Sequence, residues 1–222
     1  MESITRGTDG AQYYKADLHV HTPGSHDYED DPSPSELVDV FLDEGIDLVA
    51  VTDHDCAGWY ERLREAAADT PLEVLPGVEI TTAQGGENQI HLTAIFPPEE
   101  HTAVNHILSQ IGINPETPGQ GQANERINDI CQRILKHNGL PILAHIDRAS
   151  GAHQETGTGD IRNEIFDDEC VAAIEVVDPE FSDEYPEFPA IRSSDAHELD
   201  HIGRGYTYLK MTEPSFEGLQ TA

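Results

Sequence analysis

Short apolar runs that end in histidine or carboxylate residues recur along most of this chain. The first is Asp17-Leu18-His19-Val20-His21, in which His19 and His21 stand two residues apart. Because side chains alternate between the two faces of a strand, both imidazoles leave the same side of a sheet. Similar endings follow at Asp53-His54-Asp55, Val78-Glu79, His91, Ala144-His145 and Asp195-Ala196-His197. Metal sites are built in this way, so the pattern predicts a fold in which several strand ends meet.

The apolar runs alternate with segments of helical periodicity, which indicates an α/β fold with a mostly parallel sheet. We expect strands at 15–20, 46–51, 72–75 with 78–80, 89–96, 140–144, 171–177, 189–192 and 205–211. We expect a first helix that starts within 32–36 and ends at Gly45, and further helices at 59–68, 102–111, 124–137 and 161–166. We expect loops at 114–122, 148–159 and 178–187. Ser33 or Ser35 caps the first helix. Candidate ligands that follow strands favour a closed or nearly closed barrel with its site at the C-terminal face.

The two ends of the chain carry weaker signals. Residues 1–14 are mostly polar and are expected to be frayed or disordered, ahead of a single domain at 15–222. A helix capped by Ser215 starts close to Ala222 without a stop signal. This pattern fits either the N-terminal part of a longer protein or a helix that ends the chain.

The charge is strongly acidic, with 12 Lys and Arg against 43 Asp and Glu and a formal net charge of −31. Such a chain repels itself in dilute buffer, whereas at molar salt the Debye length falls to about 3 Å and screens the repulsion. We interpret this as adaptation to a salty cytosol, as in halophilic archaea, with an ordinary acidic protein as the alternative. The acidic surface argues against non-specific binding to duplex nucleic acid.

Other compositional features favour the cytoplasm and exclude a membrane. The three cysteines form no CxxC pair, which fits a reducing compartment. The N-terminus shows no apolar signal-peptide region. No apolar run approaches the roughly 18 residues that a membrane span requires.

The groups that could converge are more numerous than one tetrahedral metal site requires. They are His19, His21, Asp27, His54, Glu79, His91, His145, Asp195 and His197. They suit two or three divalent ions bridged by a carboxylate, for which Glu79 is the candidate. Nitrogen and oxygen ligands without thiolate suit Zn²⁺, Mn²⁺ or Fe²⁺ and do not choose among them.

Several further histidines compete for a role. His26 competes with Asp27 for one ligand position, and we prefer Asp27. His201 is a weak candidate for substrate contact. The remaining histidines are expected in solvated helices or a loop: His101, His106, His137 and His153.

These segments, in this order, resemble the PHP (polymerase and histidinol phosphatase) domain. The resemblance extends from Asp17 to about Lys210 and rests on four motifs: Asp17-Leu18-His19-Val20-His21-Thr22, Val51-Thr52-Asp53-His54-Asp55, Leu143-Ala144-His145 and Ser194-Asp195-Ala196-His197. It implies a distorted (β/α)7 TIM-like barrel, a trinuclear metal centre and hydrolysis of phosphate esters. The segment Phe216-Glu217-Gly218-Leu219 also resembles PHP domains fused ahead of an ATPase-like region.

The resemblance also implies three ligand groups. His19, His21, Glu79 and Asp195 would hold one ion, Glu79, His91 and His145 a second, and Asp27, His54 and His197 a third. The chain departs from the family pattern at Ser25-His26-Asp27, where many members carry Ser-Asp-Gly. It departs again at Ala144-His145-Ile146, where the family often has Ala-His-Pro.

The expected reaction is hydrolysis of a nucleotide or another small phosphorylated substrate. Clustered divalent ions lower the pKa of bound water and offset charge on phosphoryl oxygens. Glu79, Asp195 and His197 are the candidate catalytic groups. Arg148 and Arg204 are candidates for a bidentate grip on phosphate.

Two other classes of function remain open from the sequence. An amidohydrolase-type metal hydrolase shares the HxH opening but often uses a carbamylated lysine, and Lys15, Lys136 and Lys210 do not stand at plausible strand ends. A non-catalytic or regulatory metal-binding domain, fused to an ATPase-like partner, is the second alternative.

Overall fold

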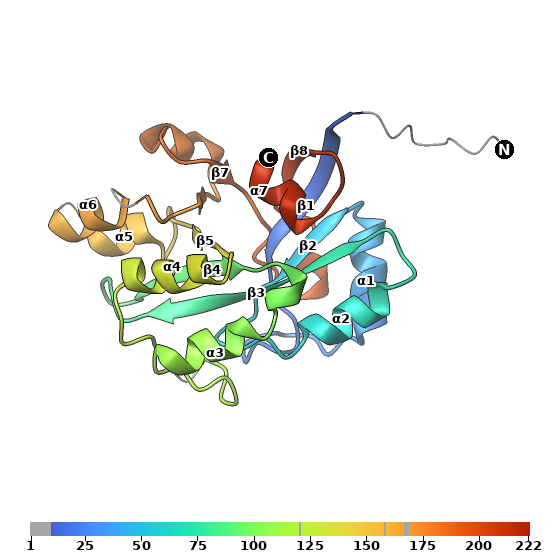
Figure 1. Cartoon of the computed structure of the whole chain (residues 1–222), viewed down its shortest axis with the longest axis horizontal. Helices are drawn as coiled ribbons and strands as arrows, with labels where there is room; N and C mark the ends of the chain where they lie inside the picture. Colours follow the sequence, from blue (N-terminus) through green and yellow to red (C-terminus); the bar gives the residue numbers. More distant parts are fainter. Residues whose placement is uncertain (1–9, 120, 158, 167–168) are drawn as a thin grey trace.

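A single eight-stranded sheet forms the frame of the molecule (Figure 1), in the order β7-β6-β5-β4-β3-β2-β1-β8. The computed structural model describes residues 10–119, 121–157, 159–166 and 169–222. The strands are β1 (Gln12–Val20), β2 (Leu48–Val51), β3 (Glu73–Thr82), β4 (Ile90–Ile95), β5 (Leu140–Leu143), β6 (Ala173–Glu175), β7 (Ala190–Ile191) and β8 (Thr207–Met211).

Helices follow most strands and cover the outside of the sheet (Figure 1). The α-helices are α1 (Pro34–Asp43), α2 (Tyr60–Ala67), α3 (Ala103–Gln110), α4 (Ile127–Lys136), α5 (Ala152–Thr156), α6 (Asp160–Phe166) and α7 (Phe216–Thr221). Short 3₁₀ turns are η1 (Pro98–Glu100), η2 (Pro179–Glu184) and η3 (Leu199–His201).

The sheet curls until the segment after β7 meets β1. The backbone N–H of Asp195 donates to the carbonyl of His19 at 2.9 Å, and that of His21 donates to Ala196 at 3.1 Å. These bonds nearly close a barrel, which confirms the expected α/β barrel. The resemblance implied seven strands, and β8 adds an eighth as an antiparallel edge beside β1.

Strand direction departs from an all-parallel arrangement at β4, which runs antiparallel to both β3 and β5. The first residues of β4 therefore lie at the same end of the barrel as the last residues of β3 and β5. As a result, His91, near the start of β4, reaches the mouth where the other candidate ligands lie.

A few element boundaries differ from the sequence expectation. β1 begins at Gln12 rather than Lys15, because residues 12–16 pair with β8. Expected fraying is therefore wrong for 12–14, while residues 1–9 lie outside the described residues. The expected loops at 148–159 and 178–187 contain α5 and η2.

A capping box fixes the start of α1. The Ser33 hydroxyl accepts from the backbone N–H of Glu36 at 3.3 Å, and the Glu36 carboxylate accepts from the Ser33 N–H at 2.8 Å. Ser33, rather than Ser35, is therefore the cap. Buried Leu37 and Phe41 attach the helix to the sheet.

Apolar side chains from every strand fill the barrel interior, and α7 contributes Phe216 to the same cluster. Two other clusters join the outer strand faces to the helices, with α1 and α2 on one side and α3 and α4 on the other. His19, His21, Glu79 and His145 are buried polar side chains that belong to none of these apolar clusters.

Candidate metal centre

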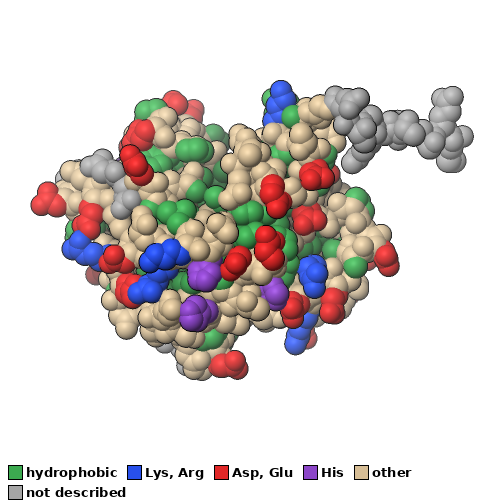
Figure 2. Space-filling model, in the orientation of Figure 1, with side chains coloured by type: hydrophobic (Ala, Val, Ile, Leu, Met, Phe, Trp, Pro, Cys, Tyr) green, Lys and Arg blue, Asp and Glu red, His purple; other side chains and the backbone are tan. Residues whose placement is uncertain are grey.

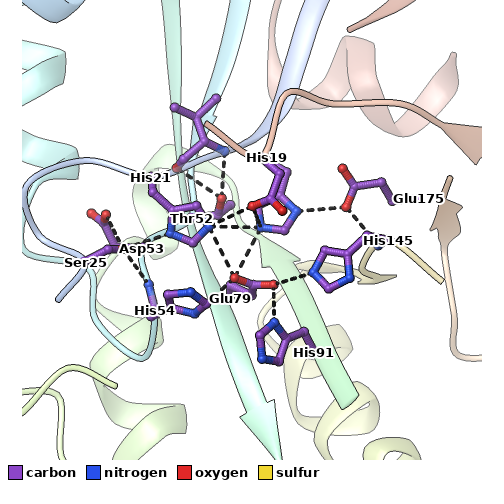
Figure 3. Close-up of polar contacts among 12 residues, drawn as sticks. His19, His21, Ser25, Thr52, Asp53, His54, Glu79, His91, His145 and Glu175 are labelled. Atoms are coloured by element: carbon purple, nitrogen blue, oxygen red, sulfur yellow. Dashed lines mark hydrogen bonds and ion pairs between the residues drawn. The ribbon is translucent and has the colours of Figure 1, made fainter. Parts of the chain in front are cut away.

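A β-bulge turns the first histidine pair into the barrel. Ala16 and Leu18 belong to the interior cluster, whereas Val20 packs in an outer cluster. The pairing of β1 with β2 shifts by one residue between Asp17 and Val20. Such a bulge reverses which side chains face inward. His19 and His21 thereby point into the mouth, as Figure 3 shows.

Glu79 lies at the centre of the site and is 1% exposed. Its Oε2 lies 3.3 Å from Nε2 of both His19 and His21 and 3.1 Å from Nδ1 of His54. Its other oxygen, Oε1, lies 2.8 Å from Nδ1 of His91 and 3.1 Å from Nε2 of His145. One buried carboxylate thus faces imidazoles on both of its sides (Figure 3).

The fourth motif supplies a second carboxylate to the His19 and His21 pair. Asp195 Oδ1 lies 3.5 Å from Nε2 of His19 and 3.2 Å from Nε2 of His21. Together with Glu79, these residues form a four-residue group whose ligand atoms all lie within 4.8 Å of one another. We call it the four-atom cage: His19 Nε2, His21 Nε2, Glu79 Oε2 and Asp195 Oδ1.

Asp27 faces the remaining two predicted ligands. Its Oδ2 lies 3.5 Å from Nε2 of His54 and 3.3 Å from Nε2 of His197. The competing His26 is more than half exposed and lies 3.7 Å from the other oxygen of Asp27. The geometry therefore favours Asp27 over His26 as the group that faces the site.

Two of the site residues have strained backbones. His145 has φ 27° and Asp195 has φ 50°, in the region that L-residues rarely adopt. Such strain persists only where surrounding contacts enforce it, and it clusters at functional sites. The sharp turns aim both side chains into the mouth just after β5 and β7.

Buried carboxylates behind the ligands were missed by sequence reasoning. Glu175 Oε2 accepts from Nδ1 of His19 at 2.8 Å, and Asp53 Oδ1 accepts from the Ser25 hydroxyl at 2.9 Å. Ser25 in turn lies 2.8 Å from Nδ1 of His21. The signal for Glu175 was a single acidic residue inside the apolar run 171–177, which the sequence analysis treated only as strand.

The electrostatics of the site strongly favour positive charge between the carboxylates. Burial disfavours charged imidazoles, but the nearby carboxylates outweigh it, so the pKa of His19 is raised well above its usual range and that of His21 to about 9. The same histidines hold the pKa of the buried Glu79 and of the partly exposed Asp195 well below their usual range. The carboxylates thus remain ionised, and their negative charge favours the binding of cations between them.

The hydrogen bonds at the outer ring nitrogens indicate that His19 and His21 can bind a metal ion in place of protons. His19 Nδ1 donates to Glu175, and His21 Nδ1 donates to Ser25, whose hydroxyl proton is committed to Asp53. In neutral rings, both Nε2 lone pairs therefore point into the cage, where they lie 3.3 Å apart. Two facing lone pairs repel unless a proton on one ring or a metal ion lies between them.

The cage also has the dimensions of a tetrahedral ion site. Ligand distances of about 2.0–2.1 Å place tetrahedral ligand atoms about 3.3 Å apart. The five separations given for the cage lie between 3.2 and 3.5 Å. In addition, the cage atom Asp195 Oδ1 is buried without a hydrogen-bond partner, as is His54 Nδ1, which lies beside the cage atom Glu79 Oε2. These residues therefore fit a divalent ion.

A cavity of about 390 Å³ opens above this centre. Its lining residues are Asp27, His54, Glu79, His91, His145, Arg148, Ala149, Ser150, Val177, Asp195 and His197. Arg148 thus lies where the sequence predicts a phosphate-binding residue. Arg204 is exposed and does not line this cavity, so its predicted role gains no support from its position.

The other histidines lie away from the centre. His201 Nε2 pairs with Glu198 at 2.5 Å, and His153 lies on α5 beside the hydroxyl of Tyr185 at 2.6 Å. His101 bonds Pro98, His106 bonds Gln110, and His137 bonds Glu100.

No helix in the described ranges has the length and apolar character of a membrane span.

Comparison with protein-family models gives a match over residues 180–222 to a family described as PHP-associated. A curated relative, a 5′-3′ exoribonuclease of Haemophilus influenzae, is 31% identical over 94 residues, which are 42% of this chain and 33% of that protein. The alignment thus spans about a third of the relative's length.

Solved structures share the fold. The lesion-specific endonuclease EndoQ of Pyrococcus furiosus has a TM-score of 0.76 at 16% identity, over 95% of this chain and 56% of that chain. A two-domain Bacteroides vulgatus protein containing a predicted PHP-like metal-dependent phosphoesterase has a TM-score of 0.66 at 19% identity, over 96% of this chain and 63% of that chain. A Chromobacterium violaceum amidohydrolase with bound sulfate has a TM-score of 0.66 at 19% identity, over 93% of this chain and 95% of that chain.

Proposed function

We propose that this chain is a metal-dependent phosphoric ester hydrolase of the PHP type. The observation that carries the proposal is the four-atom cage, in which two imidazole lone pairs and two ionised carboxylates converge at tetrahedral separations. The PHP-associated match at the C-terminus and the shared barrel of PHP-like structures support the same assignment.

We assign the ligands to three divalent ions. The first ion is held by the cage, the second by Glu79, His91 and His145, and the third by Asp27, His54 and His197. Glu79 serves both the first and the second, because its two oxygens face different imidazoles. All ligands are nitrogen or oxygen, which suits zinc, manganese or iron.

The chemistry that such ions supply is the activation of water and the neutralisation of phosphoryl oxygens during in-line displacement. The chain's own groups orient the reactants. His197 Nδ1 donates to the backbone carbonyl of Asp195 at 3.0 Å, which leaves its Nε2 free to face Asp27 and the cavity. Arg148 at the cavity wall provides a planar donor pair for a phosphate. Glu79, Asp195 and His197 are the proposed catalytic groups.

A small phosphorylated molecule is the substrate class we favour. Arg148 is the sole Lys or Arg that lines the cavity in the described part of the chain, and the net charge of −31 repels a long polyanion. The second candidate is a nucleic-acid phosphodiester, which the likeness to an exoribonuclease and an endonuclease favours.

The decisive experiment combines metal analysis with substrate assays. We expect the purified protein to bind divalent ions and to hydrolyse p-nitrophenyl phosphate or a short oligonucleotide. A chelator should abolish the activity, and readdition of Zn²⁺ or Mn²⁺ should restore it. His19→Ala should lose metal and activity together, whereas His106→Ala, on the exposed side of α3, should lose neither.

Three results would redirect the assignment. Bound metal without turnover of any phosphate ester favours a regulatory domain, with an ATPase-like partner in the same protein. Turnover of amides alone favours the amidohydrolase-type alternative. A protein that binds no divalent ion would overturn the proposal.

The cellular setting that we propose is the cytoplasm of a halophile.

A further inference from the structure

Glu175 connects two parts of the candidate centre through a single oxygen atom. It ends β6 and is 2% exposed. Its Oε2 accepts from Nδ1 of His19 at 2.8 Å and from the backbone N–H of His145 at 3.1 Å. Figure 3 shows the carboxylate behind both imidazoles, on the side away from Glu79.

The two contacted residues lie on different sides of Glu79. His19 faces Glu79 Oε2 inside the cage, whereas His145 faces Glu79 Oε1. Their rings stack with centroids 5.7 Å apart and planes 21° apart. A change at Glu175 therefore reaches ligands that the proposed function assigns to two different ions.

Each contact fixes a property that a ligand needs. At His19, the bond to Nδ1 selects the tautomer whose Nε2 lone pair points into the cage. At His145, the bond holds the backbone N–H of a residue with φ 27°, at the turn that aims its ring into the site. No Lys or Arg pairs with Glu175 within the described ranges, so its carboxylate acts on these two groups.

We propose that Glu175 is a positioning residue that sets the affinity of the first two ion sites together. This inference rests on the proposed function only for the ligand assignment, and it concerns metal binding rather than turnover. Carboxylate partners of ligating histidines typically change metal affinity by about 10–100-fold when removed.

The test uses Glu175→Ala and Glu175→Gln in the full chain. We expect Glu175→Ala to weaken Zn²⁺ or Mn²⁺ binding by about 10–100-fold, measured by titration with a competing chelator. Glu175→Gln keeps an oxygen acceptor without the charge, so its affinity should fall by about tenfold. In imidazole nitrogen NMR spectra at saturating Zn²⁺, the hydrogen-bonded His19 Nδ1 proton should give a signal in Glu175→Gln and lose it to solvent exchange in Glu175→Ala.

Asp147→Asn is the matched control. Asp147 is 7% exposed at the same end of the barrel and accepts from the backbone N–H groups of Val177 and Asp178 at 2.9 and 2.8 Å. In neither of these bonds does Asp147 contact the ring of a ligand histidine. We expect it to lower the melting temperature as the Glu175 variants do, while metal affinity and the His19 signal stay unchanged.

Two outcomes would overturn the proposal. Unchanged metal affinity in Glu175→Gln would do so, even where Glu175→Ala fails to fold. Equal loss of affinity in Asp147→Asn would show that Glu175 supports only the fold. Because these readouts need no substrate, a wild type that binds metal but cleaves no phosphate ester would defeat the proposed function and leave the role of Glu175 intact.

Discussion

Three of the ligand histidines are each held in one ring orientation by a group behind them. Glu175 lies behind His19, Ser25 lies behind His21, and the backbone carbonyl of Asp195 lies behind His197. Each of these partners accepts from Nδ1, so each ring presents Nε2 to the site. The fold thus sets which nitrogen of each ring faces the site, whether that nitrogen binds a proton or a metal ion.

Removal of the Ser25 hydroxyl tests this arrangement at His21. Ser25→Ala should weaken metal binding by about tenfold, because His21 Nδ1 loses the acceptor that links it to Asp53. Chelator competition measures the effect. Ser193→Ala is the control, because the Ser193 hydroxyl accepts from the backbone of Leu18 without touching a ring. Equal affinity in the two variants would contradict the prediction.

The pH dependence of the metal-free protein tests the charge state of His21. Against burial, Asp195 and Glu79 raise the pKa of His21 from 6.5 to about 9. A group whose pKa is raised by folding stabilises the protein below its unfolded value, and this stability is lost as the pH rises through the folded value. In chelator, the urea midpoint should therefore fall between pH 6.5 and 9.

The His21→Ala variant provides the comparison for that titration. Without the imidazole, the fall in the urea midpoint should be smaller over the same pH range. A wild-type midpoint that rises with pH would show that His21 is neutral in the metal-free fold. Saturating Zn²⁺ should also flatten the wild-type curve, because metal and protons compete for the same ring nitrogens.

Among the secondary-structure elements, helices were easier to predict than strand geometry. Apolar periodicity located α1 and α2 closely, because one face of each helix is buried. The alternation at 89–96 predicted a strand but carried no information about its direction. Its reversal depends on pairing with β3, which lies outside any local pattern. The bulge in β1 is similarly a product of pairing with β2.

The cap of α1 provides a prediction for one element. Ser33→Ala should destabilise the protein by about 1 kcal/mol, because the N–H of Glu36 loses its acceptor and the capping box opens. Urea unfolding measures the change in the free energy of unfolding. Ser35→Ala, inside the same first turn but outside the cap, should change it little. If the two variants lose equal stability, Ser33 is not the cap that the structure indicates.

For the molecule as a whole, the barrel and its mouth could be predicted because polar ligands interrupt apolar runs at strand ends. Glu79 and His91 were found in this way, since each breaks a pattern that packing alone would not break. Glu175 and Asp53 were not assigned a role, because their function depends on which ring lies next to them. That information arises only when distant strands close the barrel.

The surface charge is the remaining property of the whole molecule that the sequence predicts. Figure 2 shows acidic side chains spread over the viewed face, with few basic ones among them. Some carboxylates lie close enough to repel each other. Burial and the negative charges of Glu213 and Glu217 raise the pKa of Glu73. The folded state therefore carries repulsion that salt can screen.

We expect stability to rise with salt well beyond physiological concentration. The Debye length falls from about 10 Å at 0.1 M to about 3 Å at 1 M, so repulsion among the 43 acidic residues continues to weaken over this range. Melting curves in a KCl series should show a rising midpoint. A parallel sucrose series strengthens burial without screening charge, so it separates the effect of stronger burial from the effect of charge screening. Glu73→Gln should raise the midpoint at low salt and lose this advantage at high salt. Maximal stability below about 0.2 M KCl would contradict the halophilic interpretation, because screening would then bring no gain.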